Sequence, residues 1–506
     1  QKEAAGNRKV LAHSSNMEQP EFYLIDRDFD EQDVQFDSDD ETDEVAKYKN
    51  KLEKYHLCLA CGAIAPISSA FHGDCCEFVD QAKIVTVVRI PFTGRGQDVN
   101  CCPCCGATRH RLIRRFFTAN QPATFTIAKS LYDAIPPHPL ENAAPSIQNA
   151  ADDLFSGWDA MFDTVAMPSD TQDETGRKLL IFSDNRQEAA FFAGYFQKKY
   201  RQIMWRRLIL KCVRRAGRQG ISIDSLIQDV EAEAHKCNLY QEELASDPYK
   251  IAGNYVMSEF LGLDANTGLE GLGYLQIQPI SPNRFPSLLQ PEMTGPESWG
   301  LMRYIMDTLR QKGACSFPEK ISPNDDFFAP RNRIYSFRKE GAQTTTAEAI
   351  LAFCPAEGCI NKRAAFLQKL LQKSGYSADT AKERTSERLA YIVTRLIPTG
   401  SKLFSQIQDR ILGQRYQLNY RAWRISYLEE DAVVYRCKKC GKITTYSIHG
   451  CCPEMKCSGE LEQITAGQAR GRVYYRHLLE DEKIIPMVAK EHTAQLSAQT
   501  AARDQR

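Results

Sequence analysis

The stretch GRKLLIFSDNRQEAAFFAGYFQKKY, residues 176–200, predicts a strand, a turn and a helix in succession. Residues 179–182 are apolar and residues 183–186 are polar, as in a strand that ends in a turn. Asp184 is placed to cap the helix that follows, with Gln187 three residues later as in a capping box. The apolar residues of this helix recur at helical spacing, at Ala189, Phe192, Phe196 and Tyr200. Because such units build α/β proteins that handle phosphate, the stretch predicts an α/β domain.

Length and composition indicate a globular protein of several domains. The 506 residues suffice for about three or four domains. The 43% of hydrophobic and 25% of charged residues are ordinary globular values. Lys and Arg together number 64, as do Asp and Glu. A surface for nucleic acid therefore has to be local, because the chain as a whole has no net charge.

One strongly acidic run lies near the N-terminus. Residues 28–44, DFDEQDVQFDSDDETDE, contain ten acidic and no basic residues. Like charges repel, so a solvated linker is one interpretation and a docking strip for a basic partner is the other. The sequence has no apolar run of about 18 residues and no signal peptide, so we expect a cytoplasmic protein without membrane contact. We also expect an internal piece of a larger polypeptide, because the sequence begins with Gln1 and breaks off after Arg506.

The spacing of the 18 cysteines indicates metal binding rather than disulfides. Two cysteines separated by two residues form a tight knuckle that points both thiolates at one ion, and two knuckles complete a tetrahedral zinc shell. Gly62, Gly106 and Gly441 follow such pairs, where the turn often needs a positive φ. The sequence predicts two structural zinc sites, the first formed by Cys58, Cys61, Cys102 and Cys105 and the second by Cys437, Cys440, Cys452 and Cys457.

The remaining cysteines and the histidines are not assigned as ligands of the two predicted sites. The first cluster has further cysteines that remain alternatives, as substitute ligands or as ligands of another ion: Cys75, Cys76, Cys101 and Cys104. Cysteines that lack a partner pair are predicted to be buried or core residues: Cys212, Cys237, Cys315, Cys354 and Cys359. Four thiolates leave no open position on zinc, so zinc catalysis is not expected. The histidines near the clusters stand in no strong ligand motif: His56, His72, His110 and His449.

The helix of the opening stretch continues into a basic run. Residues 198–218 contain nine Lys or Arg residues, and Tyr200 and Trp205 lie among them. A solvated helix face is one interpretation, and contact with a nucleic-acid backbone is the other. The second interpretation assigns nucleic-acid contacts to Arg206, Arg207, Arg214 and Arg215.

Residues 178–196, KLLIFSDNRQEAAFFAGYF, resemble the opening of the second RecA-like domain in a family of large prokaryotic superfamily-two DEAD/DEAH-type helicases with cysteine-rich modules. The resemblance implies that Ser183, Asn185 and Arg186 lie near the nucleic-acid backbone. Residues 126–139 resemble the connector between the two motor lobes of that family, and residues 484–497 resemble a later strand and helix of the second lobe. Relatives act in anti-phage defence and DNA repair. The resemblance therefore implies nucleic acid, with DNA favoured, and a defence-system partner subunit as partners.

The sequence motifs for ATP hydrolysis are missing from this chain. It contains no G-x-x-x-x-G-K-[ST] phosphate cradle. DDET, residues 39–42, lies in the acidic run without an apolar strand before it, and RRAGRQG, residues 214–220, is predicted to be the end of a surface helix. We expect ATP and Mg²⁺ to be bound only in the parent protein, and we assign no catalytic residue to this chain.

The predicted fold class is α/β and mixed α+β, with a partial RecA-like lobe, a helical and winged-helix insertion and two zinc-ribbon-like modules. Residues 403–427 predict a helix followed by two strands around a turn, with Arg415, Arg421 and Arg424 on the wing. This wing either contacts duplex nucleic acid or braces the lobe. The predicted divisions are an acidic segment (1–50), a first zinc module (51–120), a lobe connector (121–175), the start of the second lobe (176–215), a helical insertion (216–360), the winged helix (361–428), a second zinc ribbon (429–466) and the return to the lobe (467–506).

Two functions follow from these patterns. In the first, the chain is the zinc-containing part of an ATP-dependent DNA helicase or translocase and contributes nucleic-acid contacts. In the second, it is a non-catalytic zinc-ribbon and winged-helix scaffold that binds DNA or protein partners.

Overall fold

A computed structural model gives the structure of the chain, most completely between residues 186 and 480. The described residues there are 186–240, 247–264, 267–281, 287–288, 293–329, 331–345, 347–356, 359–399, 402–409, 413–455, 457–471 and 475–480. The other described residues are 2–4, 8–10, 22–25, 53–60, 62–68, 84–90, 120–136, 138–139, 175–176, 179–181 and 484.

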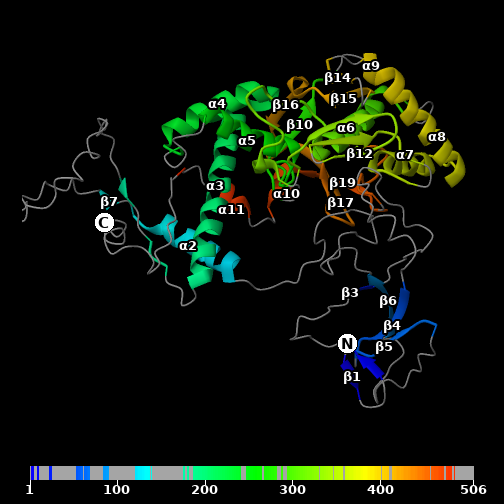
Figure 1. Cartoon of the computed structure of the whole chain (residues 1–506), viewed down its shortest axis with the longest axis horizontal. Coiled ribbons are helices and arrows are strands. Elements are labelled where there is room, and N and C mark those ends of the chain that lie inside the picture. The colour runs from blue at the N-terminus through cyan, green and yellow to red at the C-terminus, as the bar shows by residue number, and fades with distance from the viewer. Residues whose placement is uncertain are drawn as a thin grey trace, which may run out of the picture. The chain divides into compact units, whose positions relative to one another are not determined.

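The chain divides into two compact units (Figure 1). The larger unit combines Gln1–Arg115 with Trp205–Pro486, and the smaller unit combines Phe116–Met204 with Met487–Arg506. Helix α3 (Arg186–Ala216) belongs to both, because the division falls within it.

Aromatic rings hold the smaller unit together. Helix α2 (Asn120–Ala134) packs on α3 through Phe125, whose ring lies 5.1 Å from that of Phe196. Tyr132 makes an edge contact with Tyr200 at 6.1 Å. Two short strands, β7 (His138–Pro139) and β8 (Thr175–Gly176), pair antiparallel.

The strand predicted at residues 179–182 is not formed over its described part. Residues 179–181 have no regular structure, and Leu180 and Ile181 are 77% and 47% exposed. A strand needs a neighbouring strand for its backbone hydrogen bonds, and none pairs with these residues in the part of the chain that the structure describes. The helix that follows is present, and its apolar residues Phe196 and Tyr200 are buried, with their rings against those of α2.

The N-terminal part of the larger unit is a small antiparallel sheet. Its order is β3 (Phe22–Ile25), β6 (Ile84–Ile90), β4 (Glu53–Cys58) and β5 (Ile64–Pro66). Strands β1 (Lys2–Ala4) and β2 (Arg8–Val10) form a separate pair. Cys58 is fully buried at the end of β4.

Three capped helices and a three-stranded sheet build the core of the larger unit. The helices are α4 (Ile223–Lys236), α5 (Pro248–Leu261) and α6 (Gly295–Lys312). Side chains cap each N-terminus, with a capping box of Thr294 and Glu297 on α6. The sheet has the order β10 (Leu275–Pro279), β16 (Trp423–Tyr427) and β9 (Ile221–Ser222). Trp205 and Trp423 are fully buried in this core, so residues far apart in sequence share it.

A five-stranded sheet adjoins these helices. Its order is β12 (Gln343–Thr344), β13 (Glu348–Ala352), β11 (Ile334–Arg338), β15 (Gly413–Leu418) and β14 (Phe404–Asp409), and only β11 and β13 run parallel. Helices α7 (Lys362–Lys373) and α8 (Ala378–Tyr391) follow β13, and α8 continues through a π-helical turn, Ile392–Leu396, into α9 (Ile397–Thr399). The sheet thus extends across the predicted boundary between residues 360 and 361.

The helix predicted at the start of residues 403–427 is wrong, because Phe404–Asp409 is strand β14. It pairs with β15 along its whole length, and this pairing outweighs a local pattern that suits either a helix or a strand. The two predicted strands, β15 and β16, are present but lie in different sheets rather than in one hairpin. Arg415 is buried and pairs with Glu348 at 2.8 Å, whereas Arg421 remains exposed.

The last module is a three-stranded antiparallel sheet. Its order is β18 (Ile443–Thr444), β17 (Val433–Cys437) and β19 (Leu461–Thr465), and helices α10 (Ala466–Arg470) and α11 (Tyr475–Glu480) follow. The zinc-ribbon-like cysteine cluster that the sequence predicts here is present. Among the helices that the structure describes, none has the length and apolar character needed to cross a membrane.

A buried ion pair fixes helix α3 in the larger unit. Arg206 is 6% exposed, and its Nε donates to Glu259 at 2.6 Å while its Nη2 donates to Asp264 at 2.8 Å. The second carboxylate oxygen of Glu259 accepts the backbone N–H of Leu269 at 2.7 Å. The sequence run that looks uniformly basic therefore has an inward-facing side.

We expect Arg206→Met to lower the free energy of unfolding of the larger unit by about 3 to 5 kcal/mol, because it leaves the Glu259 carboxylate buried without its cation. Arg218→Met is the matched control. Arg218 is 75% exposed and pairs with an exposed Asp431 at 3.5 Å, so its loss should change stability by less than about 1 kcal/mol. Chemical denaturation followed by tryptophan fluorescence measures both, and equal effects would contradict the structural role of Arg206.

Candidate functional site

The first half of the metal site is the turn between β17 and β18. Cys437 ends β17, and its backbone N–H donates to Lys442 O at 2.9 Å. Gly441 donates to Cys437 O at 3.0 Å and has a φ of 75°, which a residue with a Cβ rarely adopts. The backbone amides of Lys439 and Cys440 lie 3.4 and 3.5 Å from Cys437 Sγ. The turn therefore provides both a thiolate pair and the N–H groups that stabilise its charge.

The second half is the loop that leads into β19. Cys452 donates its backbone N–H to Gly459 O at 3.2 Å, and Cys457 donates to Glu454 O at 3.2 Å. The N–H of Glu454 lies 3.5 Å from Cys452 Sγ. Cys451, next in sequence, is buried but is not one of the clustered thiols.

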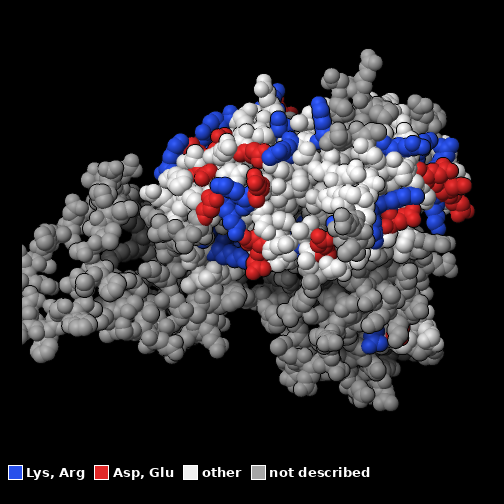
Figure 2. Space-filling view, turned by 45° about the horizontal axis from the view of Figure 1, so that its top comes forward, with Lys and Arg blue, Asp and Glu red and all other residues white. Residues whose placement is uncertain are grey.

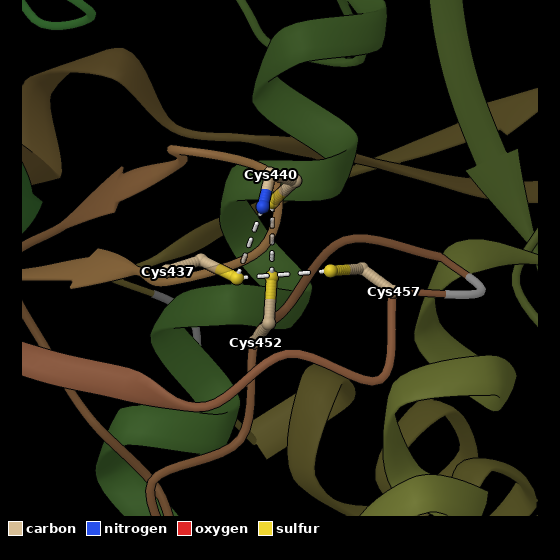
Figure 3. Close-up of side chains that lie close together, drawn as sticks. All are labelled: Cys437, Cys440, Cys452 and Cys457. Carbon is tan, nitrogen blue, oxygen red and sulfur yellow. Dashed lines mark hydrogen bonds between the residues drawn. The ribbon is translucent and has the colours of Figure 1, made fainter.

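The four sulfur atoms converge on one point (Figure 3). Those of Cys437, Cys440, Cys452 and Cys457 all lie within 4.8 Å of one another. Cys437 Sγ lies 3.7 Å from Cys457 Sγ, and Cys440 Sγ lies 3.5 Å from Cys452 Sγ. A tetrahedron with metal–sulfur bonds of about 2.3 Å has edges of about 3.8 Å, so the cluster is compatible with one zinc ion. Four thiolates would close its coordination shell, which fits a structural ion.

The surroundings of the thiols affect their ionisation in opposite directions. Burial opposes ionisation of Cys437, but hydrogen bonds from the backbone amides of Cys440 and Lys439 lower its pKa to about 7. Burial raises the pKa of Cys440 and of Cys452. A bound cation would favour the thiolate form of all four, because metal binding displaces the thiol protons.

Only one ligand of the first predicted cluster lies among the described residues. Cys58 donates its backbone N–H to Ala63 O at 2.9 Å, and Gly62, with a φ of 73°, donates to Cys58 O at 2.9 Å. These are the same two hydrogen bonds that Cys437 and Gly441 make in the other cluster. The remaining predicted ligands and their alternatives lie outside the described residues: Cys61, Cys75, Cys76, Cys101, Cys102, Cys104 and Cys105.

The structure separates the residues predicted to contact nucleic acid. Ser183 and Asn185 lie outside the described residues, and Arg186 is the first residue of α3. Arg206 and Arg207 are 6% and 4% exposed, and Arg207 donates to Leu478 O at 2.7 Å. Two of the predicted arginines are thus withdrawn from the surface by intramolecular partners.

The other two arginines lie nearer the surface, at the C-terminal end of α3. Arg214 is half-buried with its guanidinium 5.1 Å from the centre of the Tyr427 ring. Arg215 is exposed and lies 2.9 Å from the carboxylate of Glu233 on α4.

Besides Arg215, Glu233 pairs with two cations that were not among the predicted nucleic-acid contacts. Lys211 lies 2.8 Å and Lys236 3.0 Å from its carboxylate oxygens. The Glu233 side chain is 6% exposed, whereas those of Lys211, Arg215 and Lys236 are 48%, 54% and 68% exposed. Hydrogen bonds from Lys211 and Lys236 lower the pKa of Glu233 to about 2, so it stays ionised at neutral pH. We call Lys211, Arg215, Lys236 and Glu233 the cationic cluster; its three cations and one anion give a net charge of +2.

Charges of both signs lie mixed on one face of the described residues. On the face shown in Figure 2, basic and acidic side chains are interspersed over the described residues rather than gathered in one continuous patch. The spacing of Lys211 and Arg215 by four residues was visible in the sequence, but their shared carboxylate lies on another helix.

A cavity of about 600 Å³ lies between α6, the segment 262–277 and the zinc-ribbon turns. Each of its carboxylates has a basic partner, but Arg206 and Arg310 each serve two carboxylates, so these five carboxylates share three cations. The pairs are Glu259 and Asp264 with Arg206, Glu270 and Asp307 with Arg310, and Glu454 with Lys442.

Comparison of the chain with protein-family models, with curated proteins and with solved structures finds no match. The sulfur cluster and the charged groups described above are therefore the basis for any statement on function.

Gly459 provides a steric test of the metal site. A Cβ at this position would lie 2.5 Å from Cys437 Sγ and 3.3 Å from Cys457 Sγ. We expect Gly459→Ala to weaken metal binding at least tenfold, because the sulfur atoms have to move apart. Competition with a chromophoric zinc chelator measures this. Gly194→Ala is the control, since a Cβ there meets no atom within 4 Å; equal affinities for both variants would show that the sulfur positions are not those of the metal-bound site.

Proposed function

We propose that the chain is the zinc-containing part of an ATP-dependent DNA helicase or translocase of prokaryotic anti-phage defence or DNA repair. In this proposal it contributes nucleic-acid contacts, while ATP and Mg²⁺ bind elsewhere in the parent protein. The observation that carries the proposal is the closed four-cysteine cluster, which stiffens a small module without offering a catalytic position. The sequence resemblance of residues 178–196 and the cationic cluster at the end of the same helix support it.

A non-catalytic scaffold is the second candidate. It is favoured by the absence of a strand at residues 179–181, because a RecA-like lobe needs a parallel sheet at this position. ATP hydrolysis that DNA stimulates in the parent polypeptide separates the two candidates, since a scaffold has none.

We propose in addition that the chain holds a second structural zinc ion at Cys58, Cys61, Cys102 and Cys105. Support comes from the turn after Cys58, where both backbone hydrogen bonds and the positive φ of the glycine match those of the turn after Cys437. Backbone turns of this shape direct two thiolates to one ion.

We therefore expect two zinc ions per chain, and one in each of Cys58→Ser and Cys452→Ser, because a site that loses one of four thiolates binds zinc much more weakly. Elemental analysis of metal against protein after gel filtration provides the count. Cys315→Ser is the control, since Cys315 is a buried core residue and none of the predicted ligands, so this variant should keep both ions. One ion in the wild type, lost only with Cys452, would refute the second site and leave the first.

The proposed nucleic-acid contact is the cationic cluster. Its cations share one buried carboxylate, which holds them in place and neutralises only one of their three charges. Ordered cations on the surface suit phosphate groups, because less side-chain entropy is lost on binding.

We expect the variant Lys211→Gln, Arg215→Gln, Lys236→Gln and Glu233→Gln to bind single-stranded and tailed duplex DNA at least tenfold more weakly at moderate salt. The slope of log affinity against log salt should decrease by about 2. Glu233 is included so that no carboxylate is left buried without a cation. A fluorescence anisotropy titration over a salt series measures both quantities.

Lys339→Gln with Lys382→Gln is the matched control, because it also lowers the net charge by two but at exposed sites elsewhere. Equal weakening in the control would show that only total charge matters. Wild-type protein that carries zinc but binds no DNA would refute the nucleic-acid role and favour a scaffold for protein partners.

A further inference from the structure

One lysine of helix α7 contacts the metal-binding loop at three points. Lys369 Nζ donates to the backbone carbonyls of Cys452 at 2.8 Å, Glu454 at 3.0 Å and Cys457 at 2.8 Å. An ammonium group has three donors, so all of them are used. Two of the three carbonyls belong to metal ligands, and the third lies between them in the sequence.

Three carbonyl oxygens that point at one spot repel one another unless a cation lies between them. Lys369 supplies that cation from outside the module, since it lies on α7, 83 residues before Cys452 in the sequence. With its carbonyls turned toward Lys369, the loop presents the Glu454 N–H to Cys452 Sγ instead. The lysine and the metal thus require the same loop conformation.

We propose that Lys369 is a positioning residue that holds the Cys452–Cys457 loop in its metal-binding conformation and thereby sets the affinity of the site. The inference rests on the proposed metal binding at these cysteines. Residues that orient metal ligands from outside the coordination shell typically change affinity by about 10 to 100-fold.

Other contacts keep the loop near its place when Lys369 is removed. The hydroxyl of Tyr304 lies 3.1 Å from Pro453 O, and Lys442 lies 3.1 Å from the carboxylate of Glu454. The loss of Lys369 should therefore loosen the loop without unfolding the module, so that the effect appears in metal affinity.

The experiment is a titration of the reduced, metal-free full chain with Co²⁺, whose visible absorption reports tetrahedral thiolate coordination. We use Cys58→Ser as the background, so that only the second cluster contributes. In that background Lys369→Met should bind Co²⁺ at least tenfold more weakly and keep the absorption of a four-thiolate site at saturation.

Lys373→Met is the matched control. Lys373 lies on the same helix one turn later and pairs with Glu460 at 3.6 Å, but it donates to none of the three carbonyls. Its removal should leave the affinity within threefold of the background. Lys369→Arg is a second variant. A planar guanidinium cannot direct three donors at three converging oxygens, so the Co²⁺ affinity of this variant should lie between those of the background and of Lys369→Met.

The outcomes separate the inference from the proposed function. Background protein that binds no Co²⁺ refutes the metal site itself. Background protein that binds Co²⁺ while Lys369→Met binds equally well refutes the role of Lys369 alone. If Lys369→Met lowers the melting temperature of the metal-free protein as much as that of the metal-bound protein, Lys369 serves stability only, and the inference is again refuted.

Discussion

The conformation of the module at residues 433–465 is constrained above all by four sulfur atoms that lie within 4.8 Å of one another. As thiolates they repel, so the cluster requires a cation to persist in its ionised form. The module's own apolar core is small and consists of Leu428, Val434, Ala466 and Ala469, while Ile448, Cys451 and Met455 belong to the main core of the larger unit. Small modules with so few buried residues usually need a metal or a disulfide. The zinc-ribbon-like module would thus depend on a metal bound at the proposed site and on its contacts with α6 and α7.

Basic residues in the sequence serve the interior as well as the surface. Arg206, Arg310, Arg363 and Arg470 are at most 6% exposed, and their guanidinium groups donate to carboxylates or carbonyls. Arg310 is also 5.6 Å from the ring centre of Trp423, so it contributes to packing. Of the basic run in α3, Arg206 and Arg207 have partners inside the unit, whereas Lys198 and Lys199 near its start and Lys211 and Arg215 near its end are exposed. A charge count along the sequence therefore overstates the surface available to nucleic acid.

The sequence predicted the features that depend on neighbours in the chain. The turn from Cys437 to Lys442 consists of six consecutive residues, and the structure forms it as the cysteine spacing implies. The burial of Arg206 was not predictable in this way, because its partners Glu259 and Asp264 lie 53 and 58 residues away. The local pattern of β14 suits a helix for the same reason: its partner strand follows at once, but the sheet that buries Phe404 includes β11, some 70 residues earlier. The roles of Glu233 and Lys369 cannot be seen in the sequence, because each binds partners on an element distant in the sequence: Glu233 on α3, and Lys369 in the loop before β19.

At Lys369 and at Glu233, one charged side chain binds several groups of opposite charge or polarity. Glu233 holds three cations with one carboxylate, and Lys369 holds three carbonyls with one ammonium. In both cases a single side chain fixes several groups, so the loss of conformational entropy for each interaction is smaller than in separate pairs. The two differ in what remains for a ligand. The Lys369 ammonium uses all three of its donors on the carbonyls of the Cys452–Cys457 loop, so none is left for a ligand. Around Glu233 three partly exposed cations share one buried carboxylate, and the proposed nucleic-acid contact rests on the positive charge that this arrangement leaves at the surface.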